Sequence, residues 1–168
     1  PEVTSVTISP DSGVTTSTTL TCSAEATDPD GDDPSIGYAW SNDAGVALGV
    51  GASLTLTSET ASPGDLITCT ATAMDDGGST DTGTASVSVG NTSPEVTSVT
   101  ISPDSGVTTS SSLTCTAVAS DDDGDTPTVT YAWTNDTEGT SLGTGGSLTL
   151  STATSSPDDT ITCTATAT

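Results

Sequence analysis

An internal repeat constrains this chain more than any other feature of its sequence. The sequence PEVTSVTISPDSGVTTS fills Pro1–Ser17 and recurs unchanged at Pro94–Ser110, an offset of 93 residues. A period of this length is too long for a solenoid repeat and suits one small β-domain per copy. The cysteines and tryptophans repeat as well, with one residue inserted near Glu138: Cys22 matches Cys115, Trp40 matches Trp133, and Cys69 matches Cys163.

The composition favours strands and thin cores. Hydrophobic residues make up 30% of the chain, phenylalanine is absent, and Thr, Val, Ser and Gly dominate. Such a low apolar content approaches that of disordered chains, but Thr and Val favour strands. Because the alternating segments recur in both copies, we expect an all-β protein and not a disordered one.

Each copy contains about seven short alternating segments separated by turn residues. Leu20, Cys22 and Ala24 share one face of a strand in the first copy, and the period of two places that face against a core. The predicted strands of the first copy are Val3–Ser9, Thr18–Ala26, Ile36–Ser41, Val46–Gly49, Ser53–Thr57, Leu66–Ala73 and Thr84–Val89.

A cysteine on the second strand, a tryptophan on the third and a cysteine on the sixth form the pattern of the immunoglobulin sandwich. With Asp28–Asp32 (DPDGD) and Tyr38–Trp40 (YAW), the chain resembles the tandem immunoglobulin-like, PKD-like or cadherin-like repeats of bacterial surface proteins. The resemblance implies tandem β-sandwiches of about seven strands each. The domains are then residues 1–90 and 95–168, joined by a linker at 91–94.

The resemblance also implies one disulfide per repeat, Cys22–Cys69 and Cys115–Cys163. Four free thiols are the alternative, which the equal placement in both copies disfavours. Zinc is disfavoured because the chain has no CxxC pair. Disulfides place the protein in an oxidising compartment, and we expect it to be extracellular or on a cell surface.

The second copy is expected to lack its last strand. The first copy continues past Cys69 to Thr84–Val89, whereas the sequence ends at Thr168, soon after Cys163. A sandwich without this strand has an open edge. Either a continuation of the chain supplies the strand or a neighbouring chain donates it, and we favour the continuation because the first copy carries its own.

Charge excludes several functions. The chain has 23 acidic residues and no Lys, Arg or His, for a formal net charge of -23. Nucleic acid and anionic membrane surfaces are disfavoured as partners because they require basic groups, and no segment has the ~20 apolar residues of a membrane span. Without His or Lys, neither a Ser-His-Asp triad nor a Schiff base can form. A carboxylate pair remains possible, but two Trp and two Tyr are needed for two cores, so we expect no enzyme.

Two acidic loops lie between the second and third predicted strands. Calcium takes six to eight oxygen ligands, and clustered carboxylates on a Gly-containing turn supply several. We expect calcium here, with Glu95 beside the second loop, near the junction with the preceding domain. The alternatives are a solvated acidic turn and halophilic adaptation, which would scatter acidic residues over the surface. The candidate ligands are Asp28, Asp30, Asp32, Asp33, Glu95, Asp121, Asp123 and Asp125.

These features favour a structural role. We expect modules of a long extracellular filament, stalk or adhesin that are stabilised by disulfides and stiffened by calcium. The expected partners are neighbouring repeats of the same polypeptide, with possible lateral self-association. The alternatives are a carbohydrate- or protein-binding module, for which Tyr38 and Tyr131 are the only aromatic candidates beside the tryptophans, and an accessory domain of a secreted enzyme.

Overall fold

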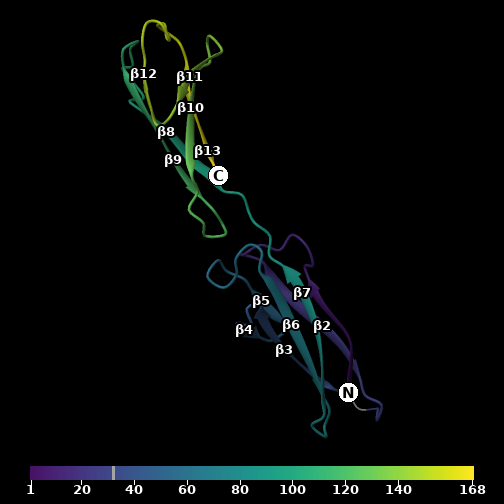
Figure 1. The fold of residues 1–168 in the computed structure, drawn as a ribbon. Helices are drawn as coiled ribbons and strands as arrows, with labels where there is room; N and C mark the ends of the chain where they lie inside the picture. Colours follow the sequence, from purple (N-terminus) through teal and green to yellow (C-terminus); the bar gives the residue numbers. More distant parts are fainter. Residues whose placement is uncertain (32) are drawn as a thin grey trace. The chain divides into compact units, whose positions relative to one another are not determined.

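The computed structural model describes residues 1–31 and 33–168, and all the regular structure in this part of the chain is β-strand (Figure 1). The described residues contain no helix that could cross a lipid bilayer. The protein is therefore all-β, as the composition and the alternating segments predict.

The first repeat forms seven strands, the predicted number. The predicted and observed boundaries agree closely except at the last strand, which begins at Thr80 and not at Thr84. The strands are β1 (Glu2–Ser9), β2 (Thr19–Thr27), β3 (Ser35–Asn42), β4 (Ala47–Val50), β5 (Ser53–Thr55), β6 (Leu66–Met74) and β7 (Thr80–Ser88).

The second repeat forms six strands. They correspond in order to the first six strands of the first repeat. The strands are β8 (Glu95–Ser102), β9 (Ser112–Ser120), β10 (Val129–Asn135), β11 (Thr140–Thr144), β12 (Ser147–Thr149) and β13 (Ile161–Ala167).

Every sheet is antiparallel, and the two repeats share one pairing scheme. In the first repeat the sheets have the orders β1-β2-β5 and β4-β3-β6-β7. In the second they have the orders β8-β9-β12 and β11-β10-β13. The schemes differ only in the seventh strand, which pairs with β6 and has no counterpart beside β13 among the described residues.

A disulfide and a tryptophan form the centre of each core. Cys22 on β2 is bonded to Cys69 on β6 with an S–S distance of 2.08 Å, so the bridge joins the two sheets. Trp40 lies opposite Cys69 in the β3–β6 register, is 1% exposed, and donates its indole N–H to the carbonyl of Gly51 at 2.8 Å. The two bonded cysteines are 47 positions apart in sequence. In the chain-entropy model, closing a loop of this length stabilises the folded state by about 4 kcal/mol, because it reduces the entropy of the unfolded chain.

The second core repeats this arrangement. Cys115 is bonded to Cys163, and Trp133 lies opposite Cys163 and donates its indole N–H to the carbonyl of Gly145 at 2.8 Å. These are the two cysteine pairs that the resemblance implies. Two disulfides indicate an oxidising environment.

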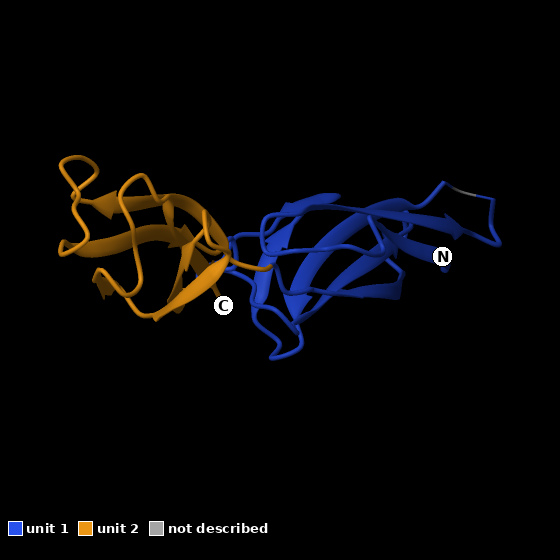
Figure 2. Cartoon of the chain, turned by 90° about the horizontal axis from the view of Figure 1, so that it is seen from above, with its two compact units in different colours: residues 1–92, 122–124 blue, residues 93–121, 125–168 orange. Residues whose placement is uncertain are grey.

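The chain divides into two compact units (Figure 2). Unit 1 comprises Pro1–Thr92 together with Asp122–Gly124, and unit 2 comprises Ser93–Asp121 and Asp125–Thr168. Each unit has its own cluster of buried apolar residues around its own disulfide.

Strand β7 begins early because tertiary contacts outweigh local propensity. Asp and Gly are disfavoured in strands, yet Asp81 and Gly83 both lie within β7. The carboxylate of Asp81 accepts the N–H of Val3 at 2.8 Å. A Cβ atom at position 83 would lie 2.8 Å from a methyl group of Val3 and of Val6, so only glycine fits there.

The substitution Gly83→Ala should therefore destabilise the first repeat by about 1–3 kcal/mol, the usual cost of overpacking. Gly37→Ala is the matched control, since Gly37 lies in β3 with open space where its Cβ would be. Urea unfolding monitored by Trp40 fluorescence, with Trp133→Phe as background, measures both changes. Equal stabilities for the two variants would contradict the packing constraint.

Candidate functional site

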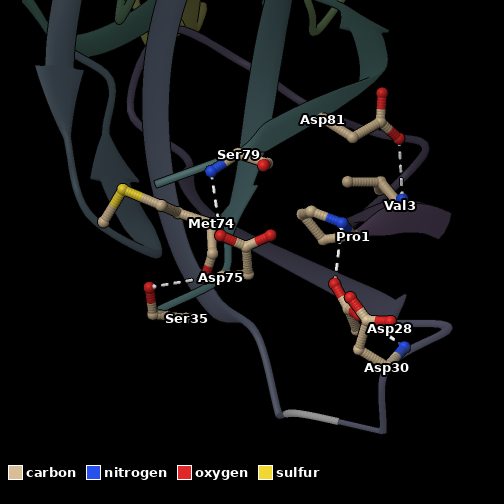
Figure 3. A network of polar contacts seen from close by, with 9 residues as sticks. All are labelled: Pro1, Val3, Asp28, Asp30, Ser35, Met74, Asp75, Ser79 and Asp81. Carbon is tan, nitrogen blue, oxygen red and sulfur yellow. Dashed lines mark hydrogen bonds and ion pairs between the residues drawn. The ribbon is translucent and has the colours of Figure 1, made fainter. Parts of the chain in front are cut away.

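The first acidic loop is held together by Asp28, the residue that directly follows β2. Its carboxylate accepts two hydrogen bonds, from the terminal ammonium of Pro1 at 2.8 Å and from the N–H of Asp30 at 2.8 Å (Figure 3). The carbonyl of Asp28 also accepts the N–H of Gly31. Gly31 has φ +87°, a conformation that glycine adopts readily. In this turn one carboxylate oxygen of Asp28 accepts the backbone N–H and the other forms the ion pair.

Two further aspartates come from the β6–β7 connection and from β7. Asp75 accepts the N–H of Ser79 at 2.8 Å and closes that turn, while Asp81 accepts the N–H of Val3 (Figure 3). Three segments that are distant in sequence thus place carboxylates around the N-terminal ammonium. This charge distribution raises the pKa of the Pro1 ammonium, first through its hydrogen bond to Asp28 and then through the charges of Asp28, Asp75 and Asp81.

Hydrogen bonding keeps two of these carboxylates ionised. The bond from the Pro1 ammonium, followed by that from the Asp30 N–H, lowers the pKa of Asp28. The N–H groups of Val3 and Thr82 lower the pKa of Asp81. In both groups, donors to the charged form outweigh desolvation.

The second acidic loop has different partners. The counterpart of Asp30 is Asp123, which is only 7% exposed. It accepts the N–H of Thr92 at 2.6 Å and the hydroxyls of Thr92 and Thr16 at 2.8 Å each.

Asp123 is therefore a carboxylate of unit 1, which includes Asp122–Gly124. The N–H of Thr92 is the main cause that lowers the pKa of Asp123, and the hydroxyls of Thr92 and Thr16 add to it against the opposing effect of burial. Thr16 also donates to the carbonyl of Asp122 at 3.1 Å. Without any Lys or Arg, three neutral donors compensate the buried charge.

The predicted calcium ligands differ in exposure. Asp30, Asp33, Glu95 and Asp125 are exposed, Asp121 is half-buried, and Asp32 lies outside the described residues. Among the residues that are described, no group of three or more acidic, His or Cys side chains is placed to hold a metal ion. The carboxylates of Asp28 and Asp123 are bonded to protein donors.

The structure adds three residues that the sequence analysis did not select: Asp81, Thr16 and Thr92. Asp81 could have been found from the sequence, because it lies two positions before Gly83 in the alternating pattern of Gly83, Ala85 and Val87 that faces inward on β7. Thr16 could not, since the identical sequence of the second copy contains Thr109 at the same place.

The chain matches no protein-family model and no curated protein. The protein is all-β and disulfide-bonded, and its antiparallel sheets form two halves, β1–β7 and β8–β13.

The Asp123 network should make unit 1 sensitive to acid. A carboxylate with a depressed native pKa stabilises the fold above its unfolded pKa, about 3.9, and this stabilisation is lost as the pH falls through the native pKa. Asp123→Asn should therefore lower the melting temperature at pH 7, and the difference from wild type should shrink as the pH falls below about 4.

The matched control is Asp30→Asn, which alters the equivalent but exposed residue of the first repeat. Thermal melts between pH 7 and pH 2 in EDTA compare the three proteins. A pH-independent effect of Asp123→Asn, or one no larger than that of Asp30→Asn at pH 7, would show that the network contributes no charge-dependent stability.

Proposed function

We propose that the chain is a tandem pair of immunoglobulin-like modules from a long extracellular filament, stalk or adhesin, with a structural and not a catalytic role. One observation carries the proposal. The same 17-residue sequence and the same Cys–Trp–Cys core recur in two separately compact units. Repetition of one structural unit extends a chain without creating a new active site.

The immunoglobulin-like assignment is supported by the pairing scheme. The first repeat has sheets of order 1-2-5 and 4-3-6-7, with bonded cysteines on the second and sixth strands and a buried tryptophan on the third. Immunoglobulin-like sandwiches combine these features. The resemblance to PKD-like and cadherin-like repeats adds only the acidic loop and the Tyr-Ala-Trp segment.

An extracellular location is supported by the disulfides and by the charge. Each thin core depends on one bridge, which persists in oxidising environments. A net charge of -23 keeps neighbouring molecules soluble.

A glycan- or protein-binding role receives no specific support from the aromatic residues. Tyr38 and Tyr131 are partly buried against the two cores. The hydroxyl of Tyr38 accepts the N–H of Ala24 at 3.2 Å. Both rings therefore contribute to packing and do not form an exposed aromatic platform.

Labelling of producing cells tests the structural role. Antibodies raised against the 168-residue chain should decorate surface fibres or stalks in electron micrographs at regular intervals. Pre-absorption of the antibodies with the purified chain is the control and should remove the label. Label confined to the cell interior, or dispersed through the medium without fibres, would contradict the proposal.

Calcium stays part of the proposal as a ligand of the acidic loops. Among the described residues, no three acidic side chains are placed to bind one ion. To bind calcium, the loop carboxylates would therefore have to give up hydrogen bonds to protein donors and turn toward the ion. The charge provides the driving force, since clustered aspartates without basic neighbours repel one another.

Thermal unfolding at constant ionic strength tests this calcium site. Millimolar calcium should raise the melting temperature above its value in EDTA, because an ion that binds only the folded state stabilises it. The double variant Asp30→Asn/Asp125→Asn should lose most of the increase, whereas Asp43→Asn, an exposed residue outside the loops, should keep it. Equal shifts with magnesium and calcium would indicate screening without a specific site.

A further inference from the structure

Unit 1 contains a covalently closed loop that leaves its first and last strands outside. The bridge between Cys22 and Cys69 encloses β3, β4 and β5. Trp40 and the carbonyl of Gly51 that it binds both lie within this loop. Strands β1 and β7 lie outside it. When the two ends of the unit are pulled apart, the force passes through the S–S bond, so the residues between the two cysteines cannot be extended.

Strands β1 and β7 run in the same direction along unit 1. Val3, near the start of β1, donates its N–H to Asp81, near the start of β7 (Figure 3). The carbonyl of Val14, beyond the end of β1, accepts the N–H of Gly90, beyond the end of β7, at 2.7 Å. The chain thus enters β1 at one end of this strand pair and leaves β7 at the other. A load applied at these two points acts along both strands and pulls them past each other.

The contact between β1 and β7 lacks a strand ladder. The two strands belong to different sheets, and no backbone pairing joins them in the part of the chain that the structure describes. Their contacts include the hydrogen bond from Val3 to Asp81 and the packing of Val3 and Val6 around Gly83. A ladder loaded along its length must break many hydrogen bonds together, whereas this contact is mainly apolar. We therefore expect β1 and β7 to separate while the S–S bond stays intact.

The end of β7 is bound to the closed loop. The carbonyl of Val89 accepts the N–H of Gly64 at 2.8 Å, and the N–H of Val89 donates to the carbonyl of Asp65 at 2.9 Å. Gly64 and Asp65 lie between the two bonded cysteines in sequence. These partners of the strand therefore stay within a segment that the bridge keeps short, and a detached β7 can find them again.

We propose that this repeat is an extensible element with a fixed limit. Under tension β1 and β7 detach, the bridge stops further extension, and both strands return when the load falls. The proposal rests on the load-bearing role in a filament or stalk that is proposed above. Return is fast because the bridge has already removed the entropy that the unfolded chain would lose on closing the loop.

The limit follows from the position of the bridge. Unit 1 includes the continuous segment Pro1–Thr92, and the bonded cysteines are 47 positions apart. The residues outside the bridge, roughly half of this segment, span at most about 160 Å when extended, whereas the whole segment would span about 330 Å. Oxidation of the two cysteines thus halves the distance over which the repeat can be pulled out.

Single-molecule force spectroscopy of the 168-residue chain, held by handles at both ends, tests the proposal. In the oxidised chain, the first repeat should give an unfolding step of at most about 160 Å that recurs in every cycle of stretching and relaxation. After reduction the same repeat should extend about twofold further. Refolding should then be slower by a factor of about ten or more, because the loop must close again without the bridge.

Variants at the contact between β1 and β7 assign the step to these strands. Asp81→Ala removes the acceptor of the Val3 N–H, so it should lower the force of the step and leave its length unchanged. Glu25→Ala is the matched control and should leave the force unchanged, because Glu25 is exposed on β2 and its counterpart in the second repeat is Val118. If Asp81→Ala does not fold, Asp81→Asn, which keeps one oxygen acceptor, is compared with Glu25→Ala.

Three results would overturn the proposal. The first is an oxidised chain without a step of this length up to the force at which the handles detach, which would make the repeat a rigid spacer. The second is a step that does not recur after relaxation, and the third is an equal force for the Asp81 and Glu25 variants. Labelled surface fibres with rigid repeats would refute the extensible element alone, whereas a recurring step without surface fibres would refute the role in a filament.

Discussion

The disulfide beside a buried tryptophan is the interaction on which each repeat depends. With 30% hydrophobic residues and no phenylalanine, neither repeat can fill its interior with large aliphatic and aromatic side chains. Trp40 supplies the bulk, its N–H is satisfied by a backbone carbonyl, and the neighbouring bridge holds the two sheets against it. A small domain with so little apolar surface is marginal without such a covalent constraint.

The absence of basic residues determines how this protein accommodates its carboxylates. A buried carboxylate needs partners that compensate its charge, and in a chain without Lys or Arg backbone N–H groups and threonine hydroxyls provide them. Asp81 binds the N–H of Val3, and Asp123 binds Thr92 and Thr16. Threonine is therefore more than a strand former in this chain, since it also solvates negative charge.

The fold could be predicted further than the site because strands leave periodic signals and polar networks do not. Alternation at Leu20, Cys22 and Ala24 located β2, and the repeat located its counterpart. The sequence did not predict the early start of β7, because Asp81 and Gly83 are disfavoured in strands. They occur there because they contact β1, which lies nearly 80 positions away in the sequence. Likewise, nothing in the sequence separates Thr16 from Thr109, although only Thr16 is shown to bind the carboxylate of Asp123.

The identical 17-residue segments allow the same residue to be compared in two surroundings within one molecule. Val14 and Val107 share the thirteen residues that precede them and the three that follow, so their methyl groups would have nearly the same NMR environment if local sequence alone determined it. They differ because one valine is covered and the other is partly open to water. The separation of the two methyl signals is thus an internal measure of how far tertiary packing, and not local sequence, determines the surroundings of a valine, and it requires neither a label nor a second protein preparation.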